Sequence, residues 1–522
     1  MITALRRRAV QLATDPVLRR WTAARLVGRV RAPDLSRRDP PYLADLKPRA
    51  APTAEPFHEL GAAAPLRAIV LPLPGEAVRV VPGEEAAVFF RRFGDIETLL
   101  ALHRFAWVPL LGEVLDPSWV AALWRGWMAT SFPPREGWAW HPYTAAERAI
   151  NLLDFARVHG MPAPLGETHE ALLAHGPAIR AALEYFGEDY TSNHLANDGR
   201  GLFLLGLALG DAASADTGGR ILVEEAKRIF RPSGVLREGS THYHALLARN
   251  YAIAAEAARA RRRPEAEALT EIAERALAVL PTLTLPGGMP LIGDISPDIP
   301  PDAMPRYESG GSAPVRDGWG RVDFGGWSAL TYASPGGLPP IPGHGHQDIT
   351  SFELHRGAEA VIRDPGRGTY MNTDDVGAAA QNGLSIDGAE PYPTNRAYFD
   401  DAFRRNIAGA PPQLSVGADE MRVTYRSGAR RWRFTPGSVE VEDELAGSGT
   451  HRVTRRLHTA LPVRIEGGVA TLDGRYRVHA DAPLTTREAV CWTAYGEGTA
   501  ATCIEARSRV ALPAKLRLEI RA

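Results

Sequence analysis

The chain has 522 residues and an almost balanced charge, with 60 lysines and arginines against 61 aspartates and glutamates. This length suits two or three folding units, each with its own core. The balance excludes a global field that would gather nucleic acid or an anionic membrane, and the sequence contains no run of about 18 apolar residues that would predict a membrane span. An anionic partner would therefore need a local basic cleft, and the oligomeric state stays open.

The cysteines and the N-terminus bear on where the chain works. Cys491 and Cys503 are the only cysteines, too few for a disulfide scaffold and without metal-binding spacing, so two free buried thiols are favoured over a cross-strand pair. The first five residues are followed by three arginines but not by the apolar segment of a secretory signal. As written, the sequence indicates a cytoplasmic protein, with a periplasmic or secreted location by another route left open.

Residues 1–95 are interpreted as an N-terminal arm and a small lead-in region. Residues 1–60 are rich in Arg, Ala and Pro, with one short amphipathic segment at about 17–30. Short apolar runs separated by Pro-Gly at 72–90 predict small strands.

Residues 96–310 carry helical periodicity and are expected to form the catalytic domain. In one clear case, residues 269, 272, 273, 276 and 280 are apolar and fall on one helix face. Many antiparallel helices with short connections predict an (α/α) toroid. Further helices are expected at 97–111, 118–128, 144–157, 168–185, 193–209, 221–230 and 240–261.

Residues 311–522 are expected to form an antiparallel β-sheet domain. The stretch from 281 to about 320 is crowded with Pro, Gly, Ser and Asp, which predicts a boundary near residue 310. Beyond it the apolar residues alternate with period two, as in Trp432 and Phe434 or Leu516 and Leu518. The fold class is therefore α+β and multidomain.

A first polar cluster lies at 191–199, where a helical pattern begins. In a helix Asn193, His194 and Asn197 share one face, and their amide and imidazole groups could hold a carboxylate. A helix-capping cluster is the alternative, since Thr, Ser and Asn are common capping residues.

A second cluster, at 238–244, enters another helix. Tyr243 stands between two histidines, and a tyrosine hydroxyl beside imidazoles can give or accept a proton if its environment adjusts its pKa. Satisfied polar groups at a helix start are the alternative.

The third cluster is Gly343-His344-Gly345-His346-Gln347-Asp348, followed by Asp364. In an extended strand both imidazoles point to the same side, and a turn at 356–357 would bring Asp364 back across a hairpin. His346 and Asp364 could then lie together as metal ligands of a zinc-compatible type. A hydrogen-bonded His/Asp hairpin is the alternative.

Together these stretches resemble the heparinase II/III family of polysaccharide lyases. The resemblance implies an (α/α) toroid followed by an antiparallel, sandwich-like β-sheet domain. It also implies β-elimination at a uronic acid, with an anionic polysaccharide of glycosaminoglycan, alginate or exopolysaccharide type as substrate. The matching pieces are His141-Pro142-Tyr143-Thr144 with Glu147, Arg148 and Asn151; Asn193-His194 with Asn197; Glu238-Gly239-Ser240 with Tyr243-His244; Gly293-Asp294; His344-Gly345-His346 with Asp348; and Asp364-Pro365-Gly366.

The resemblance also implies roles for individual residues. Asn193 and His194 would bind and neutralise the uronate carboxylate, a group that must be neutralised before the neighbouring carbon becomes acidic. Tyr243 would act as acid and, for one stereochemistry at C5, also as base, while His344 would be the other base or assist Tyr243. Supporting contacts to substrate would come from Asn197, Glu238, Arg148 and His244.

One structural divalent metal is a further implication, with His346 and Asp364 as ligands. Family members tend to have a third ligand, a histidine, where this chain has Gln381. An amide oxygen is a poorer zinc ligand and suits a harder ion. The resemblance therefore implies zinc, and Gln381 favours manganese, calcium or no metal.

Two other functions stay open at this point. A glycoside hydrolase on the same scaffold would need two placed carboxylates, for which Glu238 and Asp348 are the candidates. A non-catalytic polysaccharide-binding or assembly protein of an exopolysaccharide pathway would agree with the missing signal and the altered third ligand. The dominance of His, Tyr and Asn in the clusters favours the lyase.

Overall fold

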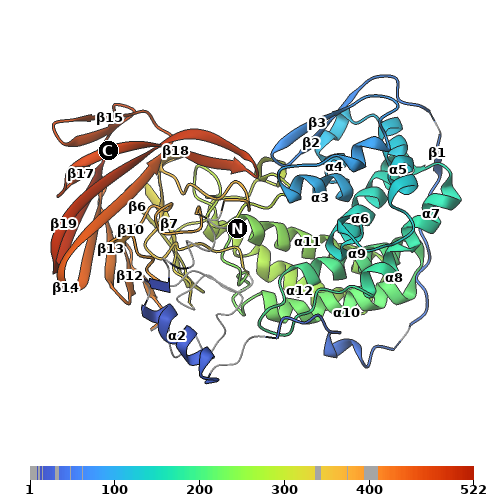
Figure 1. Cartoon of the computed structure of the whole chain (residues 1–522), viewed down its shortest axis with the longest axis horizontal. Coiled ribbons are helices and arrows are strands. Elements are labelled where there is room, and N and C mark those ends of the chain that lie inside the picture. The colour runs from blue at the N-terminus through green and yellow to red at the C-terminus, as the bar shows by residue number, and fades with distance from the viewer. Residues whose placement is uncertain are drawn as a thin grey trace.

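The computed structural model describes residues 9, 12–13, 16–29, 34–47, 49–61, 63–335, 343–372, 374–392 and 410–522. Figure 1 shows a helical domain on one side of the molecule and a domain of antiparallel strands on the other. Across the described residues, none of the helices has the length and apolar character needed to cross a bilayer.

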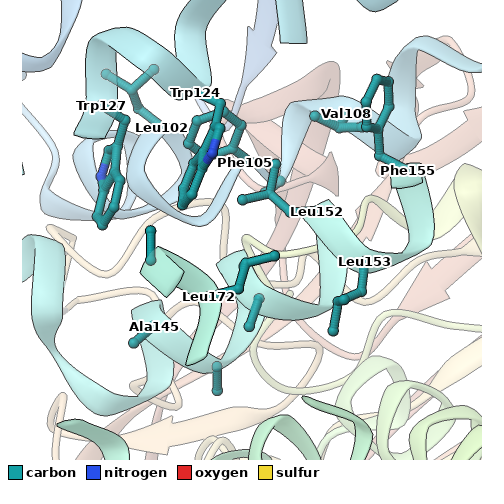
Figure 2. Close-up of a cluster of buried hydrophobic side chains, with 14 of the residues drawn as sticks. Leu102, Phe105, Val108, Trp124, Trp127, Ala145, Leu152, Leu153, Phe155 and Leu172 are labelled. Carbon is teal, nitrogen blue, oxygen red and sulfur yellow. The ribbon is translucent and has the colours of Figure 1, made fainter. Parts of the chain in front are cut away.

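The helical domain is built from helices that pack as neighbouring pairs. α5 and α6 contribute to a tryptophan-rich core, in which the rings of Trp124 and Trp127 stack 5.1 Å apart (Figure 2). The helices are α3 (Ile96–Arg104), α4 (Trp107–Leu111), α5 (Pro117–Ser131), α6 (Pro142–His159), α7 (Leu165–Leu173), α8 (His175–Arg180), α9 (His194–Leu209), α10 (Ala212–Ile229), α11 (Thr241–Ala260), α12 (Ala266–Leu277) and α13 (Leu280–Leu283).

Three of the expected helices differ from the observed ones for local reasons. The expected helix at 97–111 is split into α3 and α4, because Phe105 adopts a left-handed conformation that ends α3. α10 begins nine residues before the expected 221, because the Asp211 carboxylate caps it by accepting from the backbone N–H groups of Ala213 and Ser214. The two glycines at 218–219 interrupt its apolar pattern and hide this first half from the sequence. The expected helix at 168–185 is instead two short helices, α7 and α8, with Pro177 in the second.

The strand domain holds two antiparallel sheets. The smaller is ordered β5 (Ala313–Arg316), β6 (Trp319–Phe324), β7 (Trp327–Tyr332), β8 (Glu353–Arg356), β9 (Glu359–Ile362). The larger is ordered β11 (Gln413–Val416), β12 (Glu420–Tyr425), β13 (Gly428–Phe434), β14 (Ser438–Thr459), β19 (Glu497–Arg521), β17 (Tyr476–Ala480), β16 (Val469–Leu472), β15 (Val463–Glu466), with β10 (Leu384–Ile386) on β14 and β18 (Leu484–Ala494) on β19. Side chains of both sheets share one core. Cys491 and Cys503 are buried and free, as expected.

The lead-in region ties the two domains together. Helix α2 (Pro16–Leu26) lies beside the strand domain near β12 (Figure 1), and its Trp21 is buried in the core that the two sheets share. The chain then follows the helical domain, where Tyr42 donates a 2.7 Å hydrogen bond to Glu225. β1 (Glu59–Leu60) pairs in parallel with β4 (Met161–Pro162), and a separate hairpin forms from β2 (Ile69–Leu73) and β3 (Glu76–Val80).

Candidate functional site

Hydrogen bonds join three backbone segments where the two domains meet. His344 N–H donates to Glu238 O at 2.9 Å, and Asp294 N–H donates to His344 O at 2.8 Å. Gly293 adopts a φ of 82°, and a Cβ there would lie 2.6 Å from Gly239 O. The close approach therefore requires glycine at this position. It brings the start of α11, the chain after α13 and the glycine-histidine stretch into one site.

The side chains of Asn193, Tyr243 and His344 meet at this junction. The Tyr243 ring stacks on the His344 imidazole, with centroids 3.6 Å apart and planes at 4°. His344 Nδ1 lies 3.1 Å from Asp294 Oδ2, and Asn193 Nδ2 lies 3.3 Å from His344 Nε2. Because a carboxylate can only accept, we assign the imidazole proton to Nδ1, which leaves the Nε2 lone pair facing Asn193.

Asn193 is held by Glu238. It occupies the N-cap position of α9, but its side chain makes no capping hydrogen bond. Instead its Nδ2 donates to Glu238 Oε2 at 2.6 Å, and its backbone N–H donates to Oε1 at 3.0 Å. Glu238 is fully buried, so its carboxylate orients Asn193 and does not face solvent. The helix-capping interpretation of Asn193 therefore fails.

Tyr370 is a site residue that sequence reasoning missed. Its hydroxyl is hydrogen-bonded to the hydroxyl of Tyr243, and its backbone N–H donates to Tyr495 Oη at 3.0 Å. Tyr495 Oη in turn donates to Asp95 at 2.8 Å. Burial raises the pKa of both Tyr243 and Tyr370 well above the usual range, so both hydroxyls stay protonated. No motif surrounds Tyr370 in the sequence, and only its contacts reveal it.

His194 adds positive charge beside Asn193. Its Nδ1 lies 3.1 Å from Glu184 Oε1, and its ring lies 4.7 Å from the ring of Tyr143. Burial would lower the pKa of His194, but the Glu184 carboxylate outweighs burial and raises the pKa to about 9. His194 is therefore protonated at neutral pH, next to the amide of Asn193.

Arg148 lies outside the site, against the sequence-based assignment to substrate binding. It is fully buried, donates to His175 Nε2 at 2.9 Å and stacks 3.9 Å over the ring of Trp127. Its Nη1 donates to the backbone carbonyls of His103 and Ala139. A guanidinium enclosed in this way holds the aromatic core together and cannot reach a polymer at the surface.

His244 and Asn197 also point away from the cluster. His244 accepts from Leu236 N–H through Nδ1 at 3.1 Å and lies 2.9 Å from Ala276 O through Nε2. Both ring nitrogens are thus engaged inside the helical domain, which corrects the assignment of His244 to substrate binding. Asn197 lies one turn after Asn193 on α9, where its Oδ1 accepts from Arg200 at 3.3 Å.

The expected metal ligands are adjacent, but their arrangement does not fit zinc. His346 Nε2 lies 2.8 Å from Asp294 Oδ1, and His346 Nδ1 is met at 3.3 Å by Gln381 Nε2. Both imidazole nitrogens are therefore occupied. Within the described residues, no group of three His, Cys, Asp or Glu side chains is arranged to hold a metal ion. Asp364 is buried nearby and interacts electrostatically with His346, so the three expected ligands offer one imidazole, one carboxylate and one amide.

We expect the purified protein to carry zinc well below one ion per chain. Replacing Gln381 with histidine is expected to raise zinc content toward one per chain, because a second imidazole completes a tetrahedral N/O donor set with a water. The zinc content is measured by mass spectrometry, and the contribution of the metal to stability is measured by thermal melting with and without a chelator. The matched control is Asp364→Asn in the Gln381→His background, which should lose the zinc again. Stoichiometric zinc in the wild type would contradict the prediction, and stoichiometric manganese or calcium would assign a harder ion.

Comparison with known proteins relates this geometry to a family. Residues 308–518 match the family model described as Heparinase II/III-like, C-terminal. A crystal structure titled heparinase III is 16% identical with a TM-score of 0.58, covering 80% of this chain and 76% of its own. A heparinase III gene product is 13% identical with a TM-score of 0.57, covering 97% and 91%. A mutant of the heparan sulfate lyase HepC from Pedobacter heparinus is 14% identical with a TM-score of 0.51, covering 83% and 77%.

At these identities the structural similarity shows a shared fold. No curated protein sequence matches the chain. The expected toroid followed by a sandwich-like β-sheet domain is confirmed by the solved structures.

Proposed function

We propose that the protein is a polysaccharide lyase, on the premise that its residues 308–518 match the family model described as Heparinase II/III-like, C-terminal. Its substrate would be a polysaccharide that contains uronic acid, cleaved by β-elimination. The observation that carries the proposal is the direct contact between Asn193, Tyr243 and His344, which come from three separate segments. These are the residue types that elimination beside a carboxylate requires.

Asn193 and His194 supply what the carboxylate needs. The 3.3 Å contact from Asn193 Nδ2 to His344 Nε2 is long, and a substrate carboxylate would replace it as the acceptor. The charged imidazole of His194 stands next in the chain. An amide donor and a nearby cation together stabilise the negative charge that develops on the carboxylate when the C5 proton leaves.

His344 and Tyr243 supply the proton transfers. Asp294 holds the Nδ1 proton of His344, so Nε2 presents a lone pair and can act as the base that removes the C5 proton. Tyr243 stays protonated because of its burial, which suits an acid that protonates the departing glycosidic oxygen. Tyr370 can donate a hydrogen bond to the Tyr243 phenolate that this transfer leaves. Tyr243 then regains a proton from water, and His344 releases to water the proton that it took from C5.

The carboxylates needed by a glycoside hydrolase are poorly placed. Both oxygens of Glu238 accept hydrogen bonds from Asn193, and Glu238 is fully buried. Asp348 is 1% exposed and accepts from the backbone N–H of His346. A hydrolytic acid and base need carboxylate oxygens that are free for the scissile bond and a water. Because both oxygens of Glu238 and one of Asp348 already accept protein hydrogen bonds, these contacts favour the lyase over the hydrolase.

The test is an assay on heparan sulfate, hyaluronan, chondroitin, alginate and an exopolysaccharide of the producing organism. A lyase yields one unsaturated sugar per cleavage, so ultraviolet absorbance must rise in step with new reducing ends. New reducing ends without that absorbance would identify a hydrolase. Binding without either signal would identify a non-catalytic polysaccharide-binding protein.

We expect the affinity for an anionic polysaccharide to fall as the pH rises through about 9. His194 has a raised pKa of about 9, so it is charged below that pH and neutral above it, and its attraction for the substrate carboxylate is lost on the alkaline side. KM measured against pH should rise above pH 9 in the wild type. His194→Gln, which cannot titrate, should give a high KM that does not change across the same range. A wild-type KM that stays constant through pH 9 would exclude this role. The charged and titratable neighbours of His194 are Glu184, Asp198, Glu97, Arg104, His141 and Tyr143.

A further inference from the structure

A pocket lies on the helical domain beside the catalytic cluster of Asn193, Tyr243 and His344. Its volume is about 590 Å³, which is within the range of small-ligand sites. One wall comes from the turn that precedes α6, one from α8 and one from the lead-in region. The polar and aromatic residues that line it are Arg37, Arg135, Glu136, Trp138 and His141.

Trp138 is unusual among the tryptophans of this chain. All eleven lie in the described residues, and Trp138 alone is exposed, with 52% of its surface accessible, whereas Trp140 two residues later is 6% exposed. Leaving a large aromatic ring in water forfeits the free energy of burying it. An exposed indole in a pocket is typical of a surface that binds the flat apolar face of a ligand.

The charge around Trp138 favours an anion. Arg37 from the lead-in region and Arg135 from the segment before α6 both line the pocket. Arg37 also interacts electrostatically with the buried Glu184 and Asp198. Arg135 donates to the backbone carbonyl of Thr130, which leaves its charge uncompensated. Glu136 opposes them with one negative charge, so the two guanidinium groups give the pocket a net positive charge.

The pocket connects with the catalytic cluster through a row of rings. The Trp138 and His141 rings lie 5.6 Å apart, and the His141 and His194 rings lie 6.4 Å apart. His194 is the first residue of α9, and Asn193, which contacts His344, directly precedes it. A chain of sugars with its reacting unit at Asn193 can therefore continue over His194 and His141 toward Trp138.

We infer that this pocket is a distal subsite that binds an anionic sugar unit of the polymer. The inference rests on the proposed function and deepens it by naming a second place where substrate is recognised. Trp138 packs against the apolar face of one sugar ring, and Arg37 and Arg135 pair with its carboxylate or sulfate. The subsite makes the protein select long anionic chains over short ones.

The experiment measures binding without cleavage, by calorimetry in the Tyr243→Phe background. The probes are disaccharides and decasaccharides of hyaluronan and heparan sulfate, with a carboxyl-reduced hyaluronan decasaccharide as the uncharged probe. Trp138→Ala and the double variant Arg37→Ala/Arg135→Ala are each expected to weaken decasaccharide binding roughly tenfold, with disaccharide binding unchanged. Trp138→Phe should restore most of the affinity. Arg509→Ala, an exposed arginine on β19, is the matched control and should change nothing.

The outcomes separate the subsite from the proposed reaction. Equal decasaccharide binding by Trp138→Ala and its parent would overturn the inference, as would the absence of binding to every probe. Equal binding of the reduced and native decasaccharides would overturn the role of the two arginines. If Trp138→Ala loses binding while the wild type yields no unsaturated product, the subsite stands and the lyase activity falls. A comparison of the two polymers identifies the anion that is bound. Hyaluronan carries only carboxylates, whereas heparan sulfate carries both carboxylates and sulfates.

Discussion

Replacing Tyr243 with phenylalanine is expected to lower kcat by about 10²- to 10⁴-fold while the protein remains folded. The substitution removes only the hydroxyl, whose partner is the hydroxyl of Tyr370, and it keeps the ring that stacks 3.6 Å from His344. The loss would fall on the step in which the glycosidic oxygen leaves, since the acid that protonates it is gone. Initial rates from the absorbance of the unsaturated product measure the effect.

The matched control is Tyr251→Phe on the same helix. Tyr251 is buried, and its hydroxyl donates to Leu222 O at 3.0 Å, so its loss should lower the free energy of unfolding by about 1 kcal/mol and leave kcat unchanged. Normal turnover by Tyr243→Phe, in a preparation that melts like the wild type, would sink the assignment of Tyr243 as acid.

Replacing His344 with glutamine is expected to lower kcat by a similar factor of about 10² to 10⁴. Glutamine can still donate toward Asp294 but offers no basic nitrogen where Nε2 now lies, 3.3 Å from Asn193.

Asp294→Asn tests the same proton transfer, because Asp294 orients the imidazole of His344. Its carboxylate accepts from His344 and His346 and pairs with Arg367 at 3.1 Å, so an amide there would disturb the tautomer of His344 and lower kcat with little change in KM.

His355→Gln is the control for the loss of a buried histidine in this region. His355 lies 2.8 Å from Glu353 and accepts from Gly287 N–H, so its own hydrogen bonds go to neither Asn193, Tyr243 nor His344. It should leave turnover unchanged. If His344→Gln kept wild-type kcat, the base would have to be Tyr243 alone, and the role given to the His344–Asp294 pair would be wrong.

Much of the site could be predicted from the sequence because it lies in local motifs. Asn193, Tyr243 and His344 each stand within a short polar stretch at the start of a helix or before a strand, and the resemblance to a lyase family joined the three. The same stretches gave a wrong assignment where a motif residue points into the protein core instead of into the site. Arg148 belongs to the pattern of a matching piece, but it turns into the tryptophan core, and no spacing in the sequence indicates the direction of that turn.

The sequence by itself determined the order of the domains and the type of their elements, since one buried face imposes a period of 3.6 on a helix and of 2 on a strand. Through the family resemblance it also predicted Gln381 at the place of the expected third metal ligand, and this stays a prediction. Only the tertiary structure decided that Tyr370 meets Tyr243, that one carboxylate of Asp294 serves two histidines, and that Trp138 lines an open pocket with Arg37. These contacts join residues about 50 to 130 positions apart, and such proximity arises from the packing of whole domains, which no local pattern encodes.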